Sequence, residues 1–529
     1  MRIVDYLDKG ASLAPGAPCL TTDGQSVTYA AVQAVSVEVA AALSGRGVRP
    51  GDKVAIISAN DPLSFACVFG ISRAGAVWCP INPRSEAAEN QELLELFDCS
   101  VVLAQAAFAP MVERIRANLP MVHTVVLLDG EERAGRADGA AGADGILTWS
   151  QFIEAGAATP TSALDRPAVD DVAMIVGTGG TTGRPKGVVL TGTNLETMTA
   201  ITLMAYPFGE RPVYLALAPL THAAGVLSFP ILCLGGEIVI MRTPDVGGFL
   251  THVQDHEVTH TFLPPTLIYK VLGHPELDAT DLSSLQCFWY GAAPMSAARL
   301  EESLTRIGPV MAQLFGQTEA PMMVSTMAPA DHFRADGSVA VERLTSAGRP
   351  APLVIVAIMG ADGELLPSGA RGEIVVRSSL VTPGYYKNPD ATRDASAHGW
   401  HHTGDIGYLD ADGYLFIVDR AKDMIITGGF NVYSAEVEQA LMTHPDVQDC
   451  AVVGLPDEKW GERVEAVVQL LPGREVSPEA LVAFTKERIG SVKAPKHVHV
   501  WADLPRSKVG KVLKTDVRQE LARGVTSPG

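Results

Sequence analysis

Short apolar runs alternate with helix-like segments through the first half of the chain, and this alternation constrains the fold more than any other feature. The runs are rich in Val and Ile and lie at residues 53–58, 101–103, 124–128, 173–176 and 237–241. Residues 30–43 have the pattern of a helix that ends at Gly45 and Gly47. Strands that alternate with helices predict an α/β fold whose layers are built on mainly parallel sheets.

The character of the sequence changes after Gly348. Residues 354–358, 373–376 and 414–418 have the pattern of strands and are separated by Asp-Gly turns, which predicts a smaller β-rich unit. A further unit begins near Asp419, with a helix at 434–442 and strands at 450–454 and 464–471. Because single hydrophobic cores stop growing near about 250–300 residues, a chain of 529 residues is expected to form at least two domains.

Charge and cysteine usage restrict the partners and the compartment. The formal net charge is −19, which disfavours a nucleic-acid partner because such proteins need clustered Lys and Arg. Seven scattered cysteines without a CxxC pair fit a reducing compartment, and we expect a cytoplasmic protein without a secretory signal. Residues 212–236 carry no charge over a length that could span a bilayer. Pro219, Pro230 and several glycines interrupt this stretch, so we expect a buried core segment and no transmembrane segment.

A loop rich in glycine and threonine, residues 178–187, follows one of the predicted strands. Glycines let backbone N–H groups approach a phosphate, threonine hydroxyls add donors, and Lys186 adds a positive charge. The loop is not a Walker A motif, because Gly187 stands where that motif has Ser or Thr. It is not a dinucleotide fingerprint either, because Thr182 occupies the position of the third glycine. The composition predicts a polyphosphate site, with a plain glycine-rich turn as the alternative.

This loop resembles the phosphate loop of the adenylate-forming enzymes, which include acyl-CoA synthetases, firefly luciferase and the adenylation domains of peptide synthetases. Gly179 replaces the usual Ser of that loop, and Gly177 replaces an aromatic residue often found two positions earlier. The resemblance implies that the loop binds ATP through Thr178, Gly179, Gly180, Thr181, Thr182, Gly183 and Lys186.

Three further segments resemble the nucleotide site of that family, in the family's order. Residues 290–294 resemble the segment that lies along the adenine, 315–319 the aromatic-Gly-x-Thr-Glu motif, and 403–405 the Thr-Gly-Asp motif. Carboxylates suit these roles, since one carboxylate can accept from both ribose hydroxyls and another can bind a hard cation. The implied ATP contacts are Gly291, Ala292, Ala293, Gly316, Gln317, Thr318, Asp405 and Arg420. The implied Mg²⁺ ligands are Glu319 and Thr178.

The C-terminal quarter resembles the mobile part of these enzymes. Residues 419–423 resemble the hinge, with Lys422 as the pivot. Gly428 and Gly429 resemble the glycine pair beside the CoA tunnel, where a side chain would obstruct the pantetheine arm. Residues 505–512 resemble the mobile catalytic loop, with Lys511 as the lysine that stabilises charge at the α-phosphorus in the transition state. The resemblance implies a large domain at 1–418, a hinge at 419–423 and a small mobile C-terminal α+β domain at 424–529.

The resemblance implies two half-reactions, with ATP, Mg²⁺ and CoA as cofactors and cosubstrates. An acid and ATP give acyl-AMP and pyrophosphate, and the thiol of CoA then displaces AMP. His222 is implied to gate thiol entry, although a lone His in an apolar segment can equally be a core residue. The implied acyl pocket consists of Val226, Tyr290, Pro321 and Met322. These apolar walls favour a fatty or aryl acid over a dicarboxylic acid.

Two other functions stay open at this point. One is an acyl-AMP ligase that loads the phosphopantetheine of a carrier protein, which would use the same tunnel. The other is a non-catalytic nucleotide-binding relative, which the retention of Lys186, Glu319, Asp405, Arg420 and Lys511 disfavours. A homodimer is also an open alternative.

Overall fold

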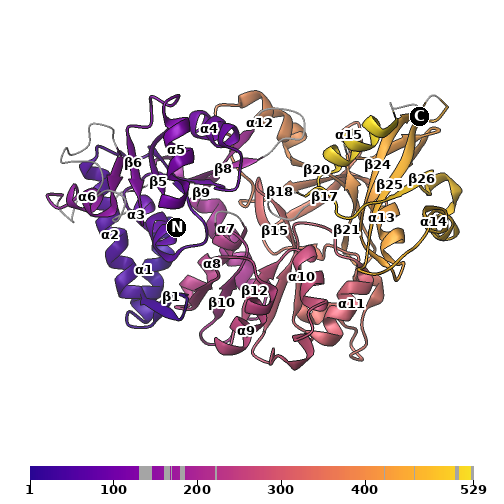
Figure 1. The fold of residues 1–529 in the computed structure, drawn as a ribbon, viewed down its shortest axis with the longest axis horizontal. Coiled ribbons are helices and arrows are strands. Elements are labelled where there is room, and N and C mark those ends of the chain that lie inside the picture. The colour runs from indigo at the N-terminus through magenta and orange to yellow at the C-terminus, as the bar shows by residue number, and fades with distance from the viewer. Residues whose placement is uncertain are drawn as a thin grey trace.

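The computed structural model describes residues 1–129, 146–159, 167, 169–178, 185–220, 223–421, 423–457, 459–506 and 512–525. In this part of the chain, strands form sheets of nine, eight, four and five members (Figure 1). The two large sheets contain long parallel runs between helices, as the alternating sequence pattern predicts, so the predicted α/β class is confirmed.

The eight-stranded sheet is built from the N-terminal apolar runs. Its order is β19-β9-β8-β4-β3-β5-β6-β7, and the run from β8 to β7 is parallel. Its strands are β3 (Lys53–Ile57), β4 (Val77–Ile81), β5 (Cys99–Ala104), β6 (Thr124–Leu127), β7 (Ile146–Thr148), β8 (Val172–Thr178), β9 (Lys186–Thr191) and β19 (Gly384–Tyr385). The accompanying helices are α2 (Tyr29–Gly45), α3 (Pro62–Arg73), α4 (Ala87–Leu96), α5 (Ala109–Arg116) and α6 (Trp149–Glu154).

Local sequence explains where two of these helices begin. Thr28 caps α2 by accepting from the N–H of Ala31, and Asp61 caps α3 by accepting from the N–H of Ser64. Pro62 follows Asp61 at the first helical position, where its missing N–H costs nothing. The predicted helix at 30–43 is therefore confirmed, with Gly45 as its last residue.

The nine-stranded sheet has the order β16-β15-β14-β13-β12-β10-β11-β1-β2. Its strands are β1 (Pro18–Thr22), β2 (Gln25–Thr28), β10 (Val213–Ala216), β11 (Glu237–Ile240), β12 (His260–Leu263), β13 (Cys287–Tyr290), β14 (Met311–Gln317), β15 (Ala320–Met327) and β16 (Arg349–Pro350). Its helices are α1 (Ile3–Leu13), α7 (Gly192–Ala205), α8 (Ala223–Cys233), α9 (Val246–Asp255), α10 (Pro265–Leu272) and α11 (Ala297–Arg306).

Alternate residues of these strands belong to two separate cores. Trp289 packs with side chains of α1, α7 and α8, whereas Tyr290 packs with side chains of α9, α10 and α11. The uncharged stretch 212–236 contains β10 and α8; α8 packs in the first core and alternate residues of β10 pack in each core, as expected of a buried segment. Within the described ranges, no helix combines the length and the apolar character needed to cross a membrane.

The predicted β-rich unit is a four-stranded antiparallel sheet in the order β17-β18-β20-β21. Its strands are β17 (Ile355–Met359), β18 (Gly372–Arg377), β20 (His401–Leu409) and β21 (Leu415–Arg420). Helix α12 (Pro389–Ala395) lies in the connection between β18 and β20. This sheet ends with β21 at Arg420.

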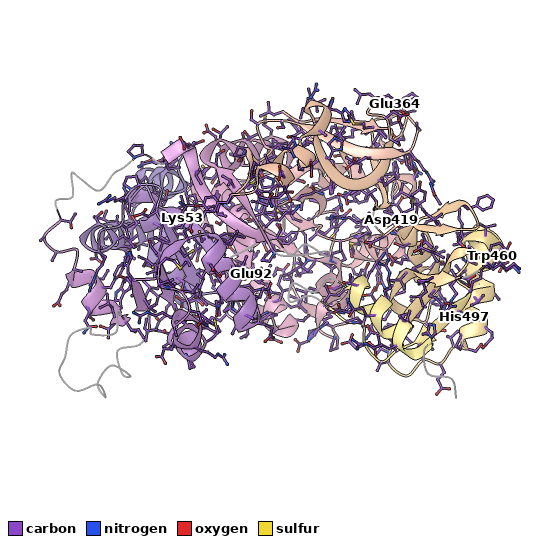
Figure 2. All side chains as sticks on the ribbon, turned by 90° about the horizontal axis from the view of Figure 1, so that it is seen from above. Lys53, Glu92, Glu364, Asp419, Trp460 and His497 are labelled. Carbon is purple, nitrogen blue, oxygen red and sulfur yellow. The ribbon has the colours of Figure 1, made fainter. Side chains whose placement is uncertain are left out.

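The C-terminal residues form a sheet of their own. Its strands are β22 (Ile425–Thr427), β23 (Phe430–Val432), β24 (Val447–Asp457), β25 (Gly461–Leu470) and β26 (His497–Val500). Its helices are α13 (Ser434–Met442), α14 (Pro478–Lys493) and α15 (Lys514–Val525). Figure 2 shows Asp419 on the inner side of this unit, with Trp460 and His497 farther out. The change of sheet falls between Arg420 and Ile425, at the segment predicted to be a hinge, whose movement stays a prediction.

Candidate active site

Several predicted site residues lie outside the described residues. They are Gly179, Gly180, Thr181, Thr182, Gly183, His222, Lys422 and Lys511. Their predicted roles rest on the resemblance alone. The remaining predicted residues can be placed, and most of them gather around the turn between β14 and β15.

The two ends of the phosphate loop are held by a pair of antiparallel strands. Thr178 ends β8 and pairs in register with Lys186, which begins β9. The hydroxyl of Thr178 donates to the carbonyl oxygen of Lys186 at 3.4 Å. The Lys186 side chain is exposed, and its Nζ lies 4.9 Å from the centre of the Tyr385 ring. The strand pair therefore fixes both ends of the loop and holds one positive charge beside it.

The turn between β14 and β15 carries Gln317, Thr318 and Glu319. A glycine is required at position 316, because a Cβ there would lie 2.4 Å from the backbone nitrogen of Met322. This close approach accompanies a register shift between Phe315 and Gln317. The three residues after Gly316 are half-buried, so their polar groups remain accessible from one side.

Glu319 is fixed by a residue that sequence reasoning did not identify. The hydroxyl of Tyr385 donates to Oε1 of Glu319 at 2.8 Å, and the N–H of Thr382 donates to the Glu319 carbonyl at 2.7 Å. Tyr385 belongs to β19, which pairs with β9 at Val188. Strand β19 thus connects the strand of Lys186 to Glu319. The only sequence signal for Tyr385 is a Gly-Tyr-Tyr run in a turn-rich segment, which carries no chemistry by itself.

Asp405 is a buried carboxylate with a partner on each oxygen. Its Oδ1 lies 2.6 Å from Nε of Arg420, and its Oδ2 accepts from Nε2 of Gln317 at 2.9 Å. The same amide nitrogen of Gln317 donates to the carbonyl oxygen of Thr403 at 2.7 Å. A buried charge is stable only when it is paired and hydrogen-bonded in this way. The structure therefore brings together Gln317, Asp405 and Arg420, which the resemblance assigns to the nucleotide.

His401 lies behind this group and was not assigned a role from the sequence. Its Nε2 lies 3.4 Å from Oε1 of Gln317. Burial lowers the pKa of His401, although the nearby carboxylate of Glu319 acts in the opposite direction. A neutral imidazole with its proton on Nε2 donates to Gln317 and leaves the Gln317 amide group facing Asp405.

The segment predicted to lie along the adenine begins at a tight approach between strands. A Cβ on Gly291 would lie 2.4 Å from the carbonyl oxygen of Leu314, so the backbones of β13 and β14 are close there. Ala292 has a positive φ of 66° and is exposed, and Ala293 is half-buried. The segment therefore presents backbone and small side chains, which suits contact with a flat ring.

The residues of the predicted acyl pocket belong to two different cores. Val226 and Met322 pack in the core beside α7 and α8. Tyr290 packs in the core on the other face of the sheet, and its hydroxyl bonds to Nε2 of His332 at 2.9 Å. Successive strand residues point to opposite faces, which separates the Tyr290 ring from Val226 and Met322. The Tyr290 ring is therefore not a wall shared with these residues, whereas the buried Pro321 directly precedes Met322 in β15.

Gly428 and Gly429 form the turn between β22 and β23. Both are exposed and have positive φ values, 57° and 81°, which favour glycine. The N–H of Gly428 donates to the carbonyl oxygen of Trp460 at 2.7 Å, and a Cβ on Gly428 would lie 2.9 Å from the Trp460 ring. The turn therefore exposes backbone without side chains at these two positions. Its contact with CoA stays a prediction.

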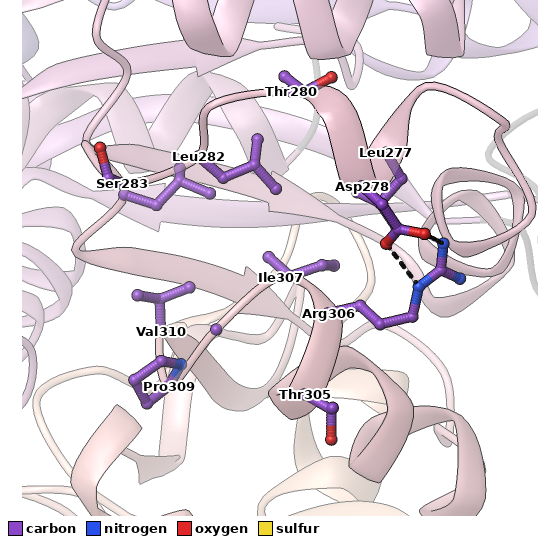
Figure 3. A pocket seen from close by; sticks show the side chains of 12 residues that line it. Leu277, Asp278, Thr280, Leu282, Ser283, Thr305, Arg306, Ile307, Pro309 and Val310 are labelled. Carbon is purple, nitrogen blue, oxygen red and sulfur yellow. Dashed lines mark hydrogen bonds and ion pairs between the residues drawn. The ribbon is translucent and has the colours of Figure 1, made fainter.

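Two pockets help to delimit the site. A surface pocket of about 600 Å³ lies between residues 277–285 and 305–310, where Arg306 pairs with Asp278 at 3.0 Å (Figure 3). None of its lining residues belongs to the predicted site. A second cavity, of about 310 Å³, is lined by Thr382, Tyr385 and His401 among others. This smaller cavity adjoins the side chains that hold Glu319 and Gln317.

Comparisons with known proteins agree with this arrangement. A family model described as AMP-binding enzyme matches residues 7–386, and one described as AMP-binding enzyme C-terminal domain matches 436–511. The medium/long-chain-fatty-acid–CoA ligase FadD8 of Mycobacterium tuberculosis is 41% identical over 372 residues, which are 69% of this chain and 64% of that protein. This match spans less than two thirds of the relative.

Two other relatives match over nearly their whole length. A feruloyl-CoA synthase of an Amycolatopsis species is 34% identical, with 97% of both chains covered. The solved structure of the amide bond synthetase McbA from Marinactinospora thermotolerans has a TM-score of 0.86 at 30% identity, covering 98% of this chain and 99% of that one. The motifs, the fold and these matches lead to one conclusion: the chain belongs to the AMP-binding enzymes, the adenylate-forming superfamily.

Proposed function

We propose that this enzyme activates a carboxylic acid with ATP as acyl-AMP, releasing pyrophosphate, and then transfers the acyl group to CoA. The observation that carries the proposal is the convergence on one turn of three separate chain segments. Gln317 of that turn contacts Asp405, and Glu319 contacts Tyr385, whose ring faces Lys186. A ribose-binding carboxylate, a cation-binding carboxylate and a phosphate-binding lysine are thereby available to a single nucleotide.

Different described residues would bind different parts of the nucleotide. Arg420 and Gln317 hold the Asp405 carboxylate, and a carboxylate is the group that can accept hydrogen bonds from the ribose hydroxyls. Lys186 stands at the end of the loop, where its charge would attract the β- and γ-phosphates. This division leaves the α-phosphorus as the reacting centre.

The residues present fit a magnesium ion shared with the nucleotide. Across the described residues, no three His, Cys, Asp or Glu side chains group closely enough to hold a metal by themselves. Mg²⁺ usually takes one or two carboxylates and completes its shell with phosphate oxygens and water. Glu319 would hold the ion, with Thr178 as the second protein oxygen. When bound, Mg²⁺ would neutralise charge on the phosphates.

The transition state for adenylation would be completed by Lys511. Attack of one anion on another accumulates negative charge at the α-phosphate, and a lysine delivered there stabilises the transition state more than the ground state. A rotation of the C-terminal domain about Lys422 would then withdraw Lys511 from the active site. The same rotation would bring the turn that contains Gly428 and Gly429 to it. Such hinge movements are a known class of domain rearrangement.

A fatty or aryl acid is the substrate class that these walls favour. Val226 is buried, Pro321 is buried and Met322 is half-buried, so the candidate walls are apolar. The relatives named for fatty-acid and feruloyl substrates are consistent with such a pocket. His222 would lie at the entrance for the thiol.

The acceptor is the second question, and CoA is the favoured one. A phosphopantetheine carrier protein would use the same tunnel, and the similarity to an amide bond synthetase raises an amine as a further acceptor. A screen of pyrophosphate release over acids of varied chain length and ring type tests activation. Adding CoA, a phosphopantetheine-bearing carrier protein or an amine, one at a time, then identifies the acceptor.

The screen has clear outcomes. We expect acid-dependent pyrophosphate release with fatty or aryl acids and thioester formation with CoA. Best activity with dicarboxylic acids would contradict the substrate class. ATP binding without pyrophosphate release from any acid would favour the non-catalytic relative.

A further inference from the structure

One tyrosine stands between the two opposite charges of the candidate ATP site. We propose that Tyr385 is a positioning residue that keeps Lys186 and Glu319 apart, so that each remains available to its own ligand. Its hydroxyl holds the carboxylate and its ring face holds the ammonium group. The inference rests on the proposed function, since it assigns phosphate to Lys186 and a divalent cation to Glu319.

The two contacts of Tyr385 use different parts of the side chain. The hydroxyl donates to Oε1 of Glu319 at 2.8 Å, while Nζ of Lys186 lies 4.9 Å from the ring centre. The negative face of an aromatic ring attracts a cation at this distance. The same ring therefore satisfies both charges without bringing them into contact.

Without this ring, Lys186 and Glu319 would attract each other directly. Water screens such attraction strongly, but Glu319 and Tyr385 are half-buried, where a close ion pair is stronger than on an open surface. A direct pair would occupy the phosphate-binding charge and the cation-binding carboxylate together. An empty site would then have to break that pair before it could bind MgATP.

The backbone fixes where the ring stands. The N–H of Tyr385 donates to the hydroxyl of Thr392 at 2.9 Å, and Tyr385 pairs in register with Val188 of β9. Thr382, three residues earlier, donates to the backbone carbonyl of Glu319. The ring is thus anchored to the strand of Lys186, and its segment is anchored to Glu319 itself.

The hydroxyl of Tyr385 is placed as a donor to one oxygen of the Glu319 carboxylate. A donor on one carboxylate oxygen orients the group and leaves the other oxygen to face a cation.

The next residue provides a matched control. The hydroxyl of Tyr386 donates to Oδ2 of Asp98 at 2.9 Å, and Nζ of Lys53 and Lys387 lie 5.1 and 5.4 Å from its ring centre. The chemistry is the same, a carboxylate at the hydroxyl and lysines around the ring. None of these partners belongs to the predicted ATP site, so Tyr386→Phe removes an equivalent hydrogen bond elsewhere.

The test measures ATP binding by calorimetry with and without Mg²⁺, using the full chain. Tyr385→Phe keeps the ring and loses the donor, so we expect unchanged binding of metal-free ATP and about a tenfold smaller gain in affinity from Mg²⁺. Tyr385→Leu also loses the ring face, so metal-free ATP should bind about tenfold more weakly as Lys186 pairs with Glu319. Adding Glu319→Gln to Tyr385→Leu should restore metal-free binding, because the competing charge is gone. Glu319→Gln alone is the reference, because loss of a carboxylate near the phosphates strengthens metal-free binding by itself. A gain in the Tyr385→Leu background that exceeds the gain in the single variant is the result that a purely structural role would not produce.

The outcomes separate this inference from the proposed function. The positioning role is overturned if Mg²⁺ raises the ATP affinity of Tyr385→Phe as much as that of Tyr386→Phe. It is also overturned if Glu319→Gln does not rescue metal-free ATP binding in Tyr385→Leu. If Tyr385→Leu does not fold by circular dichroism, the comparison of Tyr385→Phe with Tyr386→Phe decides alone. A wild-type protein that releases no pyrophosphate with any acid overturns the proposed function instead, whatever the ATP-binding results.

Discussion

Arg420 and Asp405 face each other across the last strand pair of the four-stranded sheet, with Nε of Arg420 2.6 Å from Oδ1 of Asp405. The other oxygen of Asp405 is held by Gln317, which belongs to the nine-stranded sheet. The candidate ribose site is therefore located where these two sheets meet. Arg420 is also the last residue of β21 and lies within the segment predicted to be a hinge, residues 419–423. The proposed ribose site and the predicted hinge therefore share one residue.

Replacing Asp405 by Asn should weaken ATP binding while the protein remains folded. Asn has the same shape, but it loses the charge opposite Arg420 and offers one acceptor oxygen in place of two. We expect the KM for ATP in pyrophosphate release to rise at least about tenfold, which corresponds to about 1.4 kcal/mol. Asp412→Asn, in the exposed turn between β20 and β21, is the control and should leave the KM unchanged. An unchanged KM in Asp405→Asn would remove Asp405 from the nucleotide site.

Elements with strong local signals were predictable, and elements made by distant pairing were not. The helix at 434–442 and the Val/Ile strands were located from the sequence, because their patterns are contained within a few consecutive residues. The two-residue strand β19 has no such pattern, since it exists only through its pairing with β9. The order of strands in the large sheets likewise depends on contacts between distant segments.

In the candidate site, too, residues within a local motif were predictable and residues that act through distant contacts were not. Gln317, Glu319, Asp405 and Arg420 were predicted as site residues because each lies within a short recognisable motif. Tyr385 was not, because it acts on a carboxylate 66 positions away in the chain. His401, 84 positions from Gln317, was missed for the same reason. The structure places Tyr290 in the other core from Val226 and Met322, which no motif reveals, because a motif does not say which face of a strand a side chain occupies.

Lys511→Ala should separate the two half-reactions. The lysine is assigned to the charge that develops at the α-phosphate, so its loss should slow acyl-AMP formation by about 10²–10³-fold. Conversion of supplied acyl-AMP and CoA to thioester should stay within about twofold, because that step develops its charge elsewhere. Single-turnover assays with each substrate pair measure both rates. Lys508→Ala removes a neighbouring positive charge and should change neither rate. Equal loss of both steps in Lys511→Ala would refute the assignment.

The stability of the C-terminal unit should depend on one partly buried ion pair, whose two side chains are 21% and 18% exposed. Nζ of Lys514 lies 2.7 Å from Oε1 of Glu438 and donates to the hydroxyl of Ser434 at 2.6 Å. Burial alone lowers the pKa of Lys514, but the carboxylates of Glu438 and Asp419 outweigh it and raise the pKa overall. Lys514→Met leaves the Glu438 carboxylate without its cation and should cost about 3 kcal/mol in urea unfolding.

Two controls identify the pair as the cause. Adding Glu438→Gln to Lys514→Met removes the stranded charge and should recover most of the loss. Arg393→Ala breaks an ion pair with Asp390 whose side chains are 72% and 79% exposed, and should cost under about 1 kcal/mol. If Lys514→Met unfolds at the same urea concentration as the wild type, the pair has no stabilising role.

Stability should fall as the pH drops from about 6.5 toward 4, and His332 should account for part of the fall. Its Nδ1 donates to the carbonyl oxygen of Ala328 at 3.1 Å and its Nε2 accepts from Tyr290, which requires a neutral ring. Burial lowers its pKa to about 4. The unfolded chain, with an ordinary histidine pKa of about 6.5, therefore binds more protons between these pH values. The free energy of unfolding thus decreases as the pH falls through this window, by up to about 1.4 kcal/mol per pH unit for one histidine.

His332→Asn keeps a donor for Ala328 and removes the titrating group. The variant should be less stable than the wild type at pH 7.5, because the bond to Tyr290 changes, but its stability should decline less steeply between pH 6.5 and about 4. Urea titrations at intervals of half a pH unit give both slopes. Burial also lowers the pKa of His260 to about 4, so His332→Asn should reduce the slope without abolishing it. Parallel curves for the variant and the wild type would mean that His332 titrates alike in the folded and the unfolded state.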